Sequence, residues 1–216
     1  LATTLKETEK IGLVQETEYP WEGAVKADCY RSSETVKERK RFSLFLRVPD
    51  WCEKANFEGN GEPVQGTWKA NTYAEVKPHL ERKGDCVEWV MDMPVKLLEA
   101  NPLAEEIRNQ VVVKKSGPLV YCLESMDIEG GHKIDNVLNL PNPVDSEKKI
   151  TIEGSPIVAL DGTARLVDEV SWKDTLYREV GKADKPVHIR LIPYYAWGNR
   201  GKAEMTVWMP LARTNH

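Results

Sequence analysis

The four cysteines carry the most reactive chemistry in this sequence, because a thiolate can act as a nucleophile or bind zinc. They are Cys29, Cys52, Cys86 and Cys122. Zinc needs ligands that converge to about 2.0–2.3 Å from the metal, and short spacings along the chain commonly provide them. No two of these cysteines are adjacent or form a CxxC pair. The spacing therefore indicates small buried free thiols, with disulfides as the alternative, and predicts no metal site.

Acidic residues and histidines are the candidate general acids and bases of the sequence. Acidic clusters flank two tryptophans, namely Glu16, Glu18 and Glu22 around Trp21, and Asp168 and Glu169 before Trp172. Two carboxylates about 5–9.5 Å apart can hydrolyse glycosides, but a chain with 34 acidic residues contains many clusters that are solvated faces. The histidines His79, His132, His188 and His216 show no HxH or HxxxH spacing. We therefore predict no catalytic residue in this chain.

Two aromatic-rich segments are the most distinctive feature of the sequence. They are QETEYPWEG at 15–23 and PYYAWGNRGKAEMTVWMP at 193–210. Flat rings can stack on sugar C–H groups, but such rings also pack between domains, where each removes about 150–250 Å² from water. The candidate docking or sugar-contacting residues are Tyr19, Trp21, Tyr194, Tyr195, Trp197, Asn199 and Arg200. We expect the two turns to lie close together and to dock against another domain.

The apolar pattern predicts strands throughout. A period of two residues places alternate side chains on opposite faces of a strand, and it is clearest over 41–48, 87–93 and 203–209. Asn60-Gly61, Asp161-Gly162 and Asn199-Arg200-Gly201 are expected turns, because Asn and Gly adopt positive φ readily. Short strands between Gly and Pro turns are typical of β-sandwiches.

One short helix and one domain boundary are also expected. Asn101 would cap a helix that begins at Pro102 and continues over 103–108. Pro94 ends a strongly alternating strand, so a first unit is expected to end there and a second unit to cover 95–192.

Composition and charge exclude several classes of protein. Of the 216 residues, 41% are hydrophobic and 30% are charged, which is typical of a globular domain. A net charge of −4 with interspersed signs argues against nucleic acid as a partner. No apolar run approaches the roughly 20 residues that span a bilayer, so no membrane segment is predicted.

Six groups of residues, in order along the chain, resemble one enzyme family. They are 15–23 (QETEYPWEG), 46–51 (LRVPDW), Asn60-Gly61, Gly84-Asp85 with the strand to Pro94, 116–121 (SGPLVY) with Glu124, and 193–201 (PYYAWGNRG) leading to Trp208. Together they resemble the C-terminal β-sandwich region of glycoside hydrolase family 127, the β-L-arabinofuranosidase family.

The resemblance implies an all-β chain of two β-sandwiches with at most one short helix. The second sandwich, 95–192, would be inserted before the last strand of the first, which would comprise 1–94 and 193–212. It also implies that catalysis belongs to an (α/α)6 barrel outside this sequence. That barrel would hold a cysteine nucleophile in a zinc site and hydrolyse a terminal β-L-arabinofuranoside with retention.

Two functions follow as hypotheses. In the first, the chain is a non-catalytic support, and its partner is the barrel of the same polypeptide. Through the parent enzyme it would also be associated with an arabinose-containing glycan, and the sandwiches could mediate a homodimer. In the second, the chain is a self-contained carbohydrate-binding module.

Overall fold

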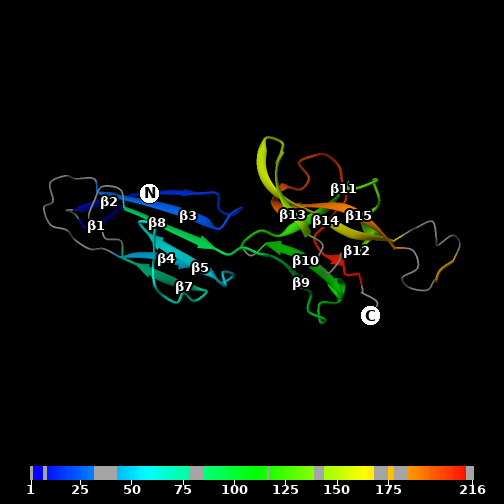
Figure 1. The fold of residues 1–216 in the computed structure, drawn as a ribbon. Helices are drawn as coiled ribbons and strands as arrows, with labels where there is room; N and C mark the ends of the chain where they lie inside the picture. Colours follow the sequence, from blue (N-terminus) through cyan, green and yellow to red (C-terminus); the bar gives the residue numbers. More distant parts are fainter. Residues whose placement is uncertain are drawn as a thin grey trace. The chain divides into compact units, whose positions relative to one another are not determined.

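The computed structural model describes residues 2–6, 9–31, 43–77, 85–115, 117–138, 144–167, 175–177 and 184–212. Its described elements are seventeen β-strands and three single turns of 3₁₀ helix, as expected of an all-β chain. The chain separates into two compact units, Leu1–Pro94 and Val95–His216 (Figure 1). The division falls at the boundary expected from Pro94. No helix of the described residues is long and apolar enough to cross a membrane.

The first unit pairs a large sheet with a small one. Its strands are β1 (Ala2–Lys6), β2 (Glu9–Thr17), β3 (Ala24–Arg31), β4 (Leu44–Val48), β5 (Ala55–Gly59), β6 (Glu62–Pro63), β7 (Thr72–Val76) and β8 (Asp85–Met91). The large sheet has the order β1-β2-β3-β8-β5-β6, and β4 pairs with β7. Both sheets contribute buried side chains to one core, including Trp89 and Phe57 from the large sheet and Val48 from the small one. The unit is therefore a sandwich.

Local sequence determines several features of this unit. Val87, Trp89, Met91 and Met93 are all buried, as their alternation predicts. The Asn60-Gly61 turn joins β5 and β6 as a two-residue hairpin, with φ of 53° and 80°. In β4, Val48 is buried and Phe45 is exposed, while residues 41 and 42 of the expected strand lie outside the described residues.

The second unit also contains two sheets. Its strands are β9 (Val95–Glu99), β10 (Gln110–Lys115), β11 (Tyr121–Ile128), β12 (Val137–Leu138), β13 (Val144–Ile152), β14 (Ser155–Val167), β15 (Asp184–Pro193), β16 (Met205–Thr206) and β17 (Met209–Pro210). One sheet has the order β12-β14-β15-β11-β16 with β13 paired to β14, and the other has the order β17-β10-β9. Residues 121–124 and 157–161 are buried without alternation, which is typical of a sheet covered on both faces.

The expected insertion of one sandwich into the other is wrong. Thr206 pairs with Leu123 of β11, and Met209 pairs with Val111 of β10, so the segment after residue 193 completes the second unit. The expected single strand over 203–209 is also wrong, because the chain bends at Val207 and Trp208 and its two short strands join different sheets. Alternation shows that a segment is extended, but it does not show which sheet edge the segment completes.

Two local expectations also fail. The expected helix over 103–108 is a single 3₁₀ turn, η1 (Glu105–Ile107), although Asn101 does accept a hydrogen bond from the Leu103 N–H at 2.9 Å. Asp161-Gly162 lies inside β14 rather than at a turn. Gly162 sits where the pairing of β13 with β14 shifts register, which is a common position for glycine in a strand. The reversal between β13 and β14 instead uses Glu153 and Gly154, both at positive φ.

Candidate binding surface of the aromatic turn

The aromatic turn, residues 194–201, projects three large side chains from the second unit. It follows β15, begins with η3 (Tyr194–Ala196), and continues through Gly198 at a φ of 77°. Tyr194, Tyr195 and Trp197 are 48%, 53% and 41% exposed. The rings of Tyr194 and Trp197 lie 6.4 Å apart between centroids. Large rings exposed together on one turn indicate a contact surface for another molecule or domain.

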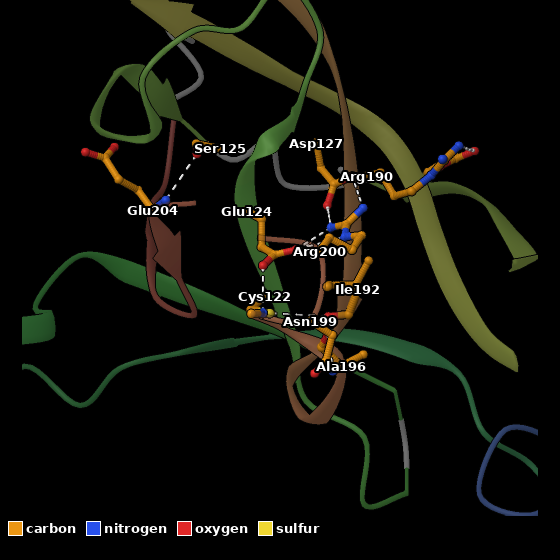
Figure 2. A network of polar contacts seen from close by, with 12 residues as sticks. Cys122, Glu124, Ser125, Asp127, Arg190, Ile192, Ala196, Asn199, Arg200 and Glu204 are labelled. Carbon is orange, nitrogen blue, oxygen red and sulfur yellow. Dashed lines mark hydrogen bonds and ion pairs between the residues drawn. The ribbon is translucent and has the colours of Figure 1, made fainter. Parts of the chain in front are cut away.

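A buried carboxylate holds this turn in place. Glu124 on β11 is 1% exposed, and its Oε1 accepts the Gly198 N–H at 2.9 Å. Its Oε2 accepts the Nε–H of Arg200 at 3.2 Å and also pairs with Nη2. Arg200 also donates to both carboxylate oxygens of Asp127, and these contacts converge on the turn in Figure 2. Hydrogen bonds to Asp127 and Glu124 raise the pKa of Arg200 above its ordinary value, so the guanidinium stays charged.

A second ion pair lies beside the first. Arg190 on β15 donates to both oxygens of Asp161 on β14, at 2.6 and 3.0 Å (Figure 2 shows Arg190 beside Asp127). These hydrogen bonds lower the pKa of Asp161 and raise that of Arg190. The two pairs lie on the same side of the sheet as the apolar cluster that contains Cys122 and Ala196.

The two polar candidates in the turn are engaged inside the protein. Arg200 forms ion pairs with Glu124 and Asp127, and the Nδ2–H of Asn199 donates to the Ala196 carbonyl at 3.2 Å. These contacts shape the turn, so the outward-facing chemistry of this surface is aromatic. Glu124 is one of the residues that carry the family resemblance, but the sequence does not predict it as a site residue. A lone glutamate in an apolar strand gives no sign of its partner 76 residues away.

Tyr19 and Trp21 occupy a turn in the first unit. The Tyr19-Pro20 peptide bond is cis, and the Trp21 N–H donates to the Glu18 carbonyl at 2.9 Å. Tyr19 is 38% exposed and stacks on Trp51 with ring centroids 6.3 Å apart, while Trp21 is half-buried. Because this turn and the aromatic turn belong to different units, their expected proximity stays a prediction.

Other candidate acids and bases do not converge. Glu16 is exposed in β2, and Glu18 and Glu22 are exposed in the turn after it. His132 and His188 are exposed in the second unit. The remaining candidates, Asp168, Glu169, Trp172, His79 and His216, lie outside the described residues.

Comparison with known proteins identifies the two units. Residues 2–93 match the model of the β-L-arabinofuranosidase GH127 middle domain, and residues 95–210 match the model of the glycoside hydrolase family 127 C-terminal domain. The chain belongs to glycoside hydrolase family 127. The two matched regions are consecutive, in agreement with the strand pairing and with the division after Pro94.

Two solved structures and one further relative are similar to this chain. A solved glycoside hydrolase is 61% identical with a TM-score of 0.87 over 99% of this chain, and a GH127 β-L-arabinofuranosidase from Geobacillus stearothermophilus T6 is 32% identical with a TM-score of 0.81 over 98%. The non-reducing end β-L-arabinofuranosidase of Bifidobacterium longum is 28% identical over 96% of this chain. The matches cover only 34%, 32% and 32% of those proteins, so this chain spans about a third of their length.

The cysteines of this family 127 chain do not fit the zinc site that the family resemblance implies. All four are free; Cys29, Cys52 and Cys122 are buried, and Cys86 is partly buried. Burial raises the pKa of Cys29 to about 11 and the pKa values of Cys86 and Cys122 to about 12, which favours the neutral thiol over the thiolate that binds metal. Among the described residues, no group of three His, Cys, Asp or Glu could hold a metal ion.

Proposed function

We propose that this chain is the non-catalytic β-sandwich region of a β-L-arabinofuranosidase-like glycoside hydrolase, and that its two sandwiches support a catalytic (α/α)6 barrel of the same polypeptide. One observation carries the proposal: the chain matches the family's middle and C-terminal domains from end to end while spanning a third of its relatives. The remaining length of those relatives is sufficient for a separate catalytic domain.

The aromatic turn is the surface proposed to contact the barrel. Its exposed rings would bury a large apolar area, and aromatic residues are enriched in the cores of interfaces. The Glu124–Arg200 pair fixes the turn before contact, which lowers the conformational entropy lost on docking. Trp197 is the expected centre of the contact, since tryptophan is common among residues that dominate interface energies.

The family suggests a chemistry for the parent protein. In this proposal the barrel would supply a cysteine nucleophile in a zinc site and would hydrolyse a terminal β-L-arabinofuranoside of a glycan, while the sandwiches supply no reacting group. A homodimer through the sandwiches is part of the same proposal. The alternative is a self-contained carbohydrate-binding module, in which the exposed rings would bind glycan without any barrel.

A chimera tests the proposal directly. The chain would replace the matching third of the 32% identical GH127 β-L-arabinofuranosidase from Geobacillus stearothermophilus T6. We expect the chimera to hydrolyse 4-nitrophenyl β-L-arabinofuranoside and the isolated chain to be inactive. The Trp197→Ala substitution should lower the melting temperature of the chimera but not that of the isolated chain. Hydrolysis by the isolated chain, or a chimera in which Trp197→Ala changes neither stability nor activity, would contradict it.

A further inference from the structure

A cleft of about 330 Å³ lies in the first unit beside the Tyr19 turn. Its apolar lining includes Val25, Trp89 and Met91, which are buried and belong to the core between the two sheets. Small-molecule sites typically measure about 300–1,000 Å³, so this cleft is at the small end of that range. Because its base is the core of the sandwich, the fold itself preforms the cleft.

Two aromatic rings form part of the cleft wall. Tyr19 and Trp51 both line it, with their ring planes only 15° apart. Trp51 is placed by a turn after β4, in which the Cys52 N–H donates to the Pro49 carbonyl at 3.2 Å. Because both rings line the cleft, each contributes apolar aromatic surface to it, and the C–H groups of a sugar ring can pack on such surface.

The cleft is also lined by side chains that donate hydrogen bonds, that accept them, or that do both. Gln15, Arg47 and Asp50 line it, and all three are exposed. A guanidinium only donates, a carboxylate only accepts, and an amide does both. Within the described part of the chain, the side chains of Arg47 and Asp50 form no hydrogen bond or ion pair. They are therefore available to a ligand.

The charges favour one class of ligand. Arg47 and Asp50 have opposite signs, so the pair attracts neither anions nor cations strongly. A neutral ligand with several hydroxyl groups can satisfy both, since each hydroxyl donates and accepts. Docking of a protein segment is less favourable, because aspartate is depleted in protein interfaces and burial against a protein would desolvate Asp50.

We propose that this cleft is a binding subsite for a neutral sugar the size of a mono- or disaccharide, packed against Tyr19 and Trp51 and hydrogen-bonded by Gln15, Arg47 and Asp50. The subsite goes beyond the support role and does not depend on it. It would hold part of a glycan at a position where this chain performs no chemistry.

The experiment uses the isolated chain and L-arabinose as the probe. The indole N–H signals of Trp51 and Trp89 would be followed by NMR, and we expect saturable shifts with a dissociation constant on the order of 1–10 mM. Trp51→Ala should weaken binding about tenfold or more, and Asp50→Asn about threefold or more. Tyr30→Ala is the matched control, because Tyr30 is 41% exposed in the same unit and does not line the cleft.

Three results would overturn the proposal: no saturable shift below about 100 mM sugar, unchanged affinity in Asp50→Asn, or equal shifts with sodium sulfate, which would indicate a simple anion site at Arg47. If Trp51→Ala does not fold, Asp50→Asn decides, since Asp50 is exposed and outside the core. The result is independent of the chimera, because it requires no barrel.

Discussion

Arg200 should contribute strongly to the stability of the second unit. Glu124 and Asp127 are 1% and 7% exposed at their side chains, and Arg200 itself is 22% exposed. Arg200→Met keeps much of the apolar stem but leaves two buried carboxylates without their cation. Breaking a buried ion pair on one side costs about 3–5 kcal/mol, and at about 4 °C per kcal/mol for a unit of this size the melting temperature should fall by about 12–20 °C.

Scanning calorimetry of the isolated chain measures this effect, with Arg108→Met as the matched control. Arg108 belongs to the same unit, but it is 51% exposed at its side chain and pairs with a Glu105 that is 83% exposed, so its removal should cost about 1 kcal/mol or less. The triple variant Arg200→Met, Glu124→Gln and Asp127→Asn should recover much of the loss, because no uncompensated charge remains. Equal effects of Arg200→Met and Arg108→Met would refute the reasoning.

Three further perturbations test the fold and its titrating groups. Gly23→Ala should destabilise the first unit by about 1–3 kcal/mol in urea unfolding, because a Cβ at this position would lie 1.9 Å from the Met91 carbonyl oxygen. Gly59→Ala is the control and should have a much smaller effect, because its Cβ would lie 3.9 Å from the nearest atom, a methyl group of Val64. Because the pKa of Asp161 is lowered in the folded state, its ionised form stabilises the fold above the unfolded-state pKa of about 3.9, and this stabilisation is lost as the pH falls through the folded-state pKa. The Asp161→Asn variant should therefore lose less unfolding free energy than the wild type between about pH 5 and pH 2. Identical pH profiles of the two proteins would contradict this. Cys122, buried with a pKa raised to about 12, should react with Ellman's reagent at pH 8 only after unfolding, and rapid modification of the native chain would count against its burial.

The binding features were only partly predictable. The exposed rings of the aromatic turn could be named from the sequence, because three large aromatic side chains within four residues are unusual. The roles of Arg200 and Asn199 could not, since each satisfies groups inside the protein. The cleft was missed for a similar reason: Tyr19 and Trp51 are separated by 32 positions and meet only when the β4 turn reaches the Tyr19 turn.

The sequence alone determined the class of fold, because side-chain alternation and turn chemistry are local properties. The burial of Val87, Trp89 and Met91 and the tight hairpin at Asn60-Gly61 follow from a few neighbouring residues. Tertiary structure decided how the pieces combine. Strand edges all offer the same backbone N–H and C=O groups, so no local pattern could show that the segment after residue 193 completes the second unit, or that the buried carboxylate of Glu124 fixes the aromatic turn.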